Sequence, residues 1–246
     1  MSIGNPQRHN QSFLADNEQR LIRWILPKLP SELKSLHLTA FGLFGSFLTA
    51  IALIGCHWST LWLPVIALGV VINWFGDSLD GSLARYRKEE RPRFGFLVDH
   101  TCDLFSQLLI IVAFGFSPYL SLVAALTILL CYLLFSAYTY IRAATQHVHQ
   151  MSYIGVGATE FRILMIIWPI VGAAAHLHEP LVNGLSNVDY TILALAALAI
   201  CGLISKSARD AFEIARDEGH APFAAPVADS EDLELQSEET AVSADR

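Results

Sequence analysis

Charged residues are scarce in this chain and are missing altogether from two long stretches. Asp, Glu, Lys and Arg make up 16% of its 246 residues, against roughly 25% in an ordinary soluble domain. None of the four occurs in residues 35–76 or in residues 104–141. A helix of about 20 apolar residues crosses a bilayer, so each stretch can hold two spans. The pattern excludes a soluble globular domain and a disordered chain.

Cysteine is also scarce, which excludes a small disulfide-rich scaffold. The chain has four cysteines, and no two of them are spaced as Cys-x-x-Cys. Cysteines dispersed through apolar sequence are typical of small packing residues. We therefore expect a packing role, and neither metal binding nor redox chemistry, for Cys56, Cys102, Cys131 and Cys201.

Turn-forming residues divide the apolar stretches, and the sequence predicts an all-α polytopic membrane protein with six transmembrane helices. The first stretch breaks at residues 55–59 (Gly-Cys-His-Trp-Ser) and the second at residues 115–118 (Gly-Phe-Ser-Pro). Two later stretches are each long enough to span once. The predicted helices cover residues 36–54, 60–84, 96–115, 119–141, 156–176 and 188–206.

The positions of the basic residues predict the orientation of these helices. Short cytoplasmic loops retain Lys and Arg. The loops after the first, third and fifth predicted helices contain neither, whereas the loop after the second contains five. We therefore predict an integral protein of an inner or endoplasmic-reticulum-type membrane, with both termini in the cytoplasm. The five loop bases are Arg85, Arg87, Lys88, Arg91 and Arg93.

The segments outside the six helices differ from them in composition. Residues 1–15 are polar, and we predict that they are disordered. Residues 16–35 are predicted to form an amphipathic helix on the cytoplasmic leaflet, with an ordinary basic flank as the alternative. The six-helix domain is assigned to residues 36–208, and residues 209–246 form an acidic tail predicted to be disordered. The apolar face of the amphipathic helix carries Leu21, Ile22, Ile25 and Leu29.

Four aspartates interrupt the second and third predicted helices. Asp77 and Asp80 are three residues apart and Asp99 and Asp103 are four apart, so each pair lies on one helix face. The short basic loop makes the two helices antiparallel neighbours, which brings the four carboxylates together near the cytoplasmic surface. Acids inside a membrane helix mark ion, proton or substrate sites.

Four facing carboxylates stay ionised together only when cations neutralise them. Ligands that are all oxygen suit Mg²⁺, Mn²⁺ or Ca²⁺ and disfavour zinc. Gly81, Ala84 and Gly95 lie within one turn of the acids. Such small residues let a bulky ligand approach the backbone, although they also serve plain helix packing. The five loop bases would attract a polyphosphate or an anionic lipid headgroup.

The spacing of these residues resembles the signature of the CDP-alcohol phosphotransferases, also called the CDP-alcohol phosphatidyltransferase family. It reads Asp77-x2-Asp80-Gly81-x2-Ala84-Arg85-x9-Gly95-x3-Asp99-x3-Asp103, and only the middle spacer, nine residues where eight is more usual, departs slightly. The resemblance covers about residues 17–208. It implies that Asp77, Asp80, Asp99 and Asp103 bind two divalent ions, Mg²⁺ or Mn²⁺. It further implies that Asp103 is the general base, and that Gly81, Ala84, Arg85 and Gly95 bind the CDP moiety and its phosphates.

The resemblance implies a phospholipid-synthesis enzyme that transfers a phospho-substituent from a CDP-linked donor to an alcohol and releases CMP. CDP-diacylglycerol with a small alcohol is favoured, because a compact six-helix core is typical of that branch. The alternative is a CDP-choline or CDP-ethanolamine donor with diacylglycerol as the acceptor. Residues 99–103 (Asp-His-Thr-Cys-Asp) resemble the sequence that members of that branch have at these positions. The expected partners are these substrates, membrane lipids and a second copy in a homodimer, with no nucleic acid.

A weaker resemblance lies at residues 157–162 (Gly-Ala-Thr-Glu-Phe-Arg), where several family members have Gly-Pro-Thr-Glu. Arg142, Glu160 and Arg162 are therefore candidate contacts to the acceptor or a donor phosphate, and anchoring of helix ends is the alternative. A cation-coupled or proton-coupled transporter is a second function class for the same acids. Against it, the acids cluster at helix ends instead of the midplane, and no broken or repeated helices are evident.

Overall fold

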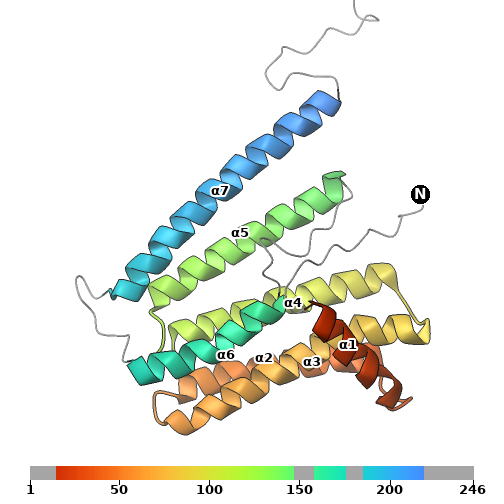
Figure 1. Cartoon of the computed structure of the whole chain (residues 1–246), viewed down its shortest axis with the longest axis horizontal. Helices are drawn as coiled ribbons and strands as arrows, with labels where there is room; N and C mark the ends of the chain where they lie inside the picture. Colours follow the sequence, from red (N-terminus) through yellow and green to blue (C-terminus); the bar gives the residue numbers. More distant parts are fainter. Residues whose placement is uncertain (1–14, 147–157, 176–184, 219–246) are drawn as a thin grey trace, which may run out of the picture. The chain divides into compact units, whose positions relative to one another are not determined.

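The computed structural model describes residues 15–146, 158–175 and 185–218, and the regular elements in these ranges are helices (Figure 1). The predicted all-α class is confirmed for this part of the chain. The elements are α1 (Ala15–Ile25), the short 3-10 helix η1 (Leu26–Lys28), α2 (Ser35–Gly55), the 3-10 helix η2 (Thr60–Trp62), α3 (Leu63–Arg87), α4 (Pro92–Gly115), α5 (Leu122–Gln146), α6 (Ala158–Ala175) and α7 (Asn187–Asp217).

Within the described ranges, five helices are long and apolar enough to cross a membrane. They are Ser35–Gly55, Thr60–Arg87, Pro92–Gly115, Leu122–Arg142 and Asn187–Asp217. Both predicted breaks are confirmed, because α2 ends at Gly55 and α4 at Gly115. The remaining predicted span, residues 156–176, coincides with α6. The apolar part of α6, Phe161–Ala174, is shorter than any of these five helices.

The chain divides within α7 into two compact units, Met1–Ile200 and Cys201–Arg246. In the second unit, α7 continues to Asp217, so the first residues of the predicted acidic tail are helical. Lys206 pairs with Asp210 one turn later at 3.5 Å. Residues 1–14 and 219–246, where disorder is predicted, lie outside the described residues.

Glycines let α2 and α3 pack with their backbones in contact. A methyl group added at Gly69 would lie 2.7 Å from the backbone nitrogen of Thr49, and one at Gly76 would lie 2.4 Å from that of Gly42. Both distances are below any real van der Waals contact, so only glycine fits. Small residues permit such close approach between membrane helices. The contact fixes α3, which carries Asp77 and Asp80, directly against α2.

α1 packs against the ends of α2 and α3. Ile22 in α1 and Leu26 in η1 are buried, 3% and 8% exposed, in a cluster with Leu38, Leu79 and Leu83, and Ile25 and Leu29 of the predicted face pack partly buried against it. The predicted apolar face is therefore partly covered by protein, while Leu21 is exposed. Burial of two aliphatic side chains of this size contributes about 3–6 kcal/mol.

Arg87 ties the segment after α1 to the end of α3. Its guanidinium donates hydrogen bonds to the carbonyl oxygens of Pro30 (2.6 Å), Ser31 (3.1 Å) and Leu33. α3 ends here because Lys88 adopts the left-handed conformation, φ 58°, which closes a helix C-terminus. The sequence interpretation placed Arg87 among the bases that attract phosphates, and in the structure its donors are engaged by the protein's own backbone.

Candidate active site

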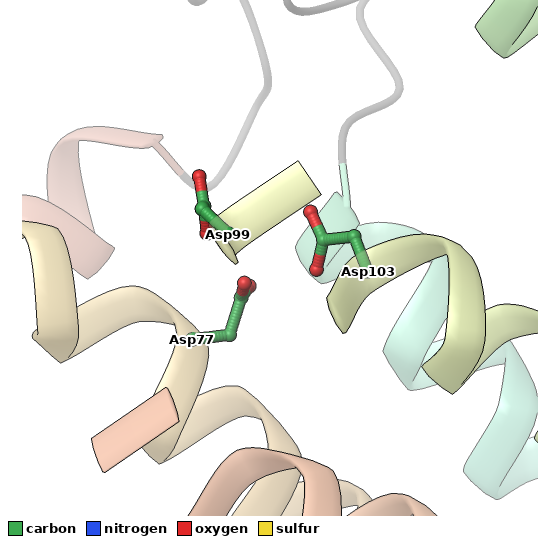
Figure 2. Close-up of side chains that lie close together, drawn as sticks. All are labelled: Asp77, Asp99 and Asp103. Atoms are coloured by element: carbon green, nitrogen blue, oxygen red, sulfur yellow. The ribbon is translucent and has the colours of Figure 1, made fainter. Parts of the chain in front are cut away.

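Three of the four predicted aspartates converge. One carboxylate oxygen from each of Asp77, Asp99 and Asp103 lies within 4.8 Å of the other two, and Figure 2 shows the three side chains gathered between α3 and α4. α3 and α4 each pack on α2 and make little contact with each other, so they are not the packed neighbours that the short loop suggests.

Asp80 lies in the wall of the same pocket. The described residues that line this pocket come from α2, α3 and α4 and include Thr39, Asn73, Cys102 and all four aspartates. Asp80 is 5% exposed, and one of its oxygens accepts a hydrogen bond from the Thr39 hydroxyl at 2.6 Å. The other accepts from the Gly81 N–H. Its carboxylate is therefore held in one orientation by α2 and by its own helix.

Arg162 reaches the site from α6. Its Nη2 donates to Asp77 Oδ2, and its Nε donates to Asn73 Oδ1 at 3.0 Å. Asn73 in turn donates through Nδ2 to Ser46 Oγ at 2.9 Å and to the Gly42 carbonyl at 3.2 Å. Arg162 is only 6% exposed, so this candidate phosphate contact is engaged inside the helix bundle.

Space remains beside both signature glycines. A methyl group at Gly95 would meet no described atom within 4 Å, and one at Gly81 would meet only the flexible end of Arg85, at 3.4 Å. Packing among the described residues therefore does not require glycine at either position. Arg85 donates to Ser82 Oγ at 3.1 Å, and Ala84, one turn from Asp80, is half-buried.

Arg142 and Glu160 are the other two candidate contacts to a substrate. Arg142 is half-buried near the end of α5, and its carbonyl oxygen accepts a hydrogen bond from the Thr145 hydroxyl at 3.4 Å. Glu160 belongs to α6, but its side chain lies outside the described residues.

Glu18 is a polar residue near the site that the sequence interpretation did not single out. Its Oε1 accepts hydrogen bonds from Trp74 Nε1 and Ser78 Oγ, both at 2.8 Å. Its Oε2 accepts from Thr159 Oγ1 at 2.7 Å. One carboxylate thus joins α1, α3 and α6 beside Asp77. Nothing in the local sequence could have indicated these contacts, since its partners are 56 to 141 residues away.

The donor set fits a hard divalent cation. The cluster offers carboxylate oxygens from three acids, with Asp80 beside them and Arg162 as the only counter-charge that the described contacts bring to Asp77. Oxygen ligands with excess negative charge are what Mg²⁺ and Mn²⁺ prefer. The residues present therefore fit such ions.

A family model matches most of the chain. The family model described as CDP-alcohol phosphatidyltransferase matches residues 35–203. The match begins at the first residue of α2 and ends within α7, and it contains all four aspartates and both signature glycines. α1, with Glu18, lies before it. No curated protein was found to match the chain.

Proposed function

Because the chain belongs to the CDP-alcohol phosphatidyltransferase family, it is a membrane transferase of phosphate-containing groups in phospholipid synthesis, and we propose CDP-diacylglycerol as its donor. The acceptor is a small alcohol, and CMP is released. The convergence of Asp77, Asp99 and Asp103 in one pocket carries the proposed transfer chemistry, and the compact helical core favours CDP-diacylglycerol as the donor. Membership of a transferase family decides against the transporter alternative.

We propose that Asp77, Asp80, Asp99 and Asp103 hold two Mg²⁺ or Mn²⁺ ions. When bound, these ions neutralise the carboxylates and the charge that develops on the donor diphosphate. The support for this assignment is that each carboxylate has several lone pairs, so the protein contacts of Asp77 and Asp80 leave oxygen sites for a metal.

Asp103 is proposed to act as the general base. It takes the proton of the acceptor hydroxyl as the hydroxyl oxygen attacks the phosphorus that carries the diacylglycerol. The bond from this phosphorus to the bridging oxygen breaks, and CMP leaves with that oxygen. The open space at Gly81 and Gly95 supports placing the CDP moiety there, with Arg85 and Ala84 beside it.

The sequence of residues 99–103 (Asp-His-Thr-Cys-Asp) favours a second candidate reaction. In this alternative the donor is CDP-choline or CDP-ethanolamine and diacylglycerol is the acceptor. The carboxylates and the proton transfer are the same in both reactions, so the two candidates differ only in which substrate carries the lipid chains.

We propose a topology of six spans, made of the five long apolar helices and the shorter α6. Both termini and the pocket are proposed to lie on the cytoplasmic side. The location of the basic residues supports this orientation. α1 is proposed to lie at that surface, where exposed Trp24 and Leu21 can enter the headgroup region. Assembly as a homodimer rests on the resemblance to the family.

The experiment that tests the function measures CMP release by the purified full-length protein in detergent–lipid micelles. Each CDP-linked donor is supplied with Mg²⁺ and a panel of alcohols, and the lipid products are identified by mass spectrometry. We expect turnover with CDP-diacylglycerol, loss of turnover with EDTA and recovery on addition of Mg²⁺. Turnover only with CDP-choline or CDP-ethanolamine and diacylglycerol selects the second candidate. Absence of CMP release from every donor contradicts both.

A further inference from the structure

We propose that Asn73 and Arg162 form a positioning pair that holds the Asp77 carboxylate in the orientation required for binding divalent cations. The inference rests on the proposed function of the aspartate site. It assigns to Arg162 a different role from the phosphate contact that the sequence suggests, and it gives a role to Asn73, which the signature does not include.

The first support is the geometry of the contacts. Arg162 uses two different nitrogens, Nη2 for Asp77 Oδ2 and Nε for Asn73 Oδ1. Asn73 uses its amide nitrogen for Ser46 and for the Gly42 carbonyl. Because α2 and α3 are in backbone contact at this level, Asn73 has little freedom. Its carbonyl oxygen therefore fixes the guanidinium, and the guanidinium fixes one oxygen of Asp77.

The second support is burial. The side chain of Arg162 is 7% exposed, against 23% for Asp77. The described residues that line the pocket include Asn73 and Asp77 but not Arg162. The guanidinium thus contacts Asp77 without lining the pocket itself. A residue in this place can orient a ligand to a metal, as outer hydrogen-bond partners of metal ligands do.

The third support is the chemistry of arginine. A buried cation in a membrane helix is tolerated when its charge and its donors are satisfied. Lysine would preserve the charge next to Asp77, but it cannot reproduce the rigid fork that serves Asp77 and Asn73 through separate nitrogens. The substitution Arg162→Lys therefore separates the effect of charge from the effect of orientation.

The test compares full-length Arg162→Lys, Asn73→Leu and Ser46→Ala proteins with the parent chain. Mn²⁺ affinity is measured without substrates by electron paramagnetic resonance, and kcat and KM for the donor are measured at saturating Mn²⁺. We expect Arg162→Lys and Asn73→Leu to bind Mn²⁺ about tenfold more weakly, in the range typical for lost outer hydrogen bonds to metal ligands. KM for the donor is expected to stay within about twofold.

Ser46→Ala serves as the graded control, because it removes only one of the two hydrogen bonds that Asn73 donates. Its small size change is compatible with folding, and we expect a loss of Mn²⁺ affinity smaller than that of Asn73→Leu. If Asn73→Leu does not fold, Arg162→Lys and Ser46→Ala decide the question.

The outcomes separate this inference from the proposed function. Unchanged Mn²⁺ affinity in Arg162→Lys overturns the positioning role, and a raised donor or acceptor KM in the same protein would restore the phosphate contact. Weakened Mn²⁺ binding in a chain that releases CMP from no donor supports the positioning pair while the proposed function fails.

Discussion

Loss of the Glu18 carboxylate is predicted to weaken the attachment of α1 to the helix bundle. Glu18 accepts three hydrogen bonds, from Trp74, Ser78 and Thr159, and it is half-buried. In Glu18→Ala all three donors lose their acceptor. Each hydrogen bond to a charged group contributes about 1.5–3 kcal/mol when its partners are shielded from water. Because Glu18 is only half-buried, we take about 1 kcal/mol for each, or about 3 kcal/mol for the set.

A loss of that size lowers the melting temperature by roughly 6–12 °C for a chain of this length. The assay is thermal melting of purified protein in detergent, read as the fraction that remains monodisperse after heating. A second readout is limited trypsin digestion, since Arg20 and Arg23 lie in α1 and become cleavable when it detaches. Gln19→Ala, which changes an exposed neighbour in the same helix, is the matched control.

Glu18→Gln refines the test, because glutamine keeps one carbonyl oxygen but carries no charge. We expect its melting temperature to fall between those of the parent and Glu18→Ala. If Glu18→Ala melts and is digested like Gln19→Ala, the three hydrogen bonds do not anchor α1, and the reasoning from these contacts is refuted.

Three further changes test other parts of the structure. Asp103→Asn should lower kcat by about 10²–10⁴-fold, the range for a lost general base, while the protein still folds; turnover equal to the parent's would remove Asp103 from that role. Thr39→Val removes the hydroxyl that orients Asp80 and should raise the Mg²⁺ concentration needed for half-maximal CMP release. Thr39→Ser keeps a hydroxyl and should need the same Mg²⁺ concentration as the parent. Equal Mg²⁺ titrations for the parent, Thr39→Val and Thr39→Ser would contradict this. Gly69→Ala should destabilise the chain by about 1–3 kcal/mol through overpacking at the contact with Thr49, and Gly202→Ala, which meets no described atom within 4 Å, is its control in the melting assay.

The sequence predicts the features that depend on local spacing. Helix breaks at Gly55 and Gly115 follow from runs of apolar residues and turn formers, and both are where the structure has them. The shared helix face of Asp99 and Asp103 follows from their four-residue spacing, and the short loop after α3 places that face near Asp77. These features need no knowledge of how distant helices pack.

Features that depend on packing could not be predicted in this way. Asn73 and Thr39 are single polar residues in apolar helices, and their partners lie on other helices. Arg87 looks like any other base of a cytoplasmic loop until its three carbonyl partners are known. The short loop also suggests that α3 and α4 pack together, whereas both helices pack on α2.

The glycine contact between α2 and α3 also bears on how the site can vary. Main-chain atoms set the separation of these two helices, so the backbone positions of Asp77 and Asp80 relative to Thr39 are fixed. Near the start of α4, a methyl group at Gly95 would meet no described atom within 4 Å, so the part of α4 that carries Asp99 and Asp103 is not fixed in this way. Asp99 and Asp103 therefore sit on the adjustable side of the pocket. Variants selected to accept a bulkier alcohol should accumulate changes along α4 and leave the α2–α3 pair untouched.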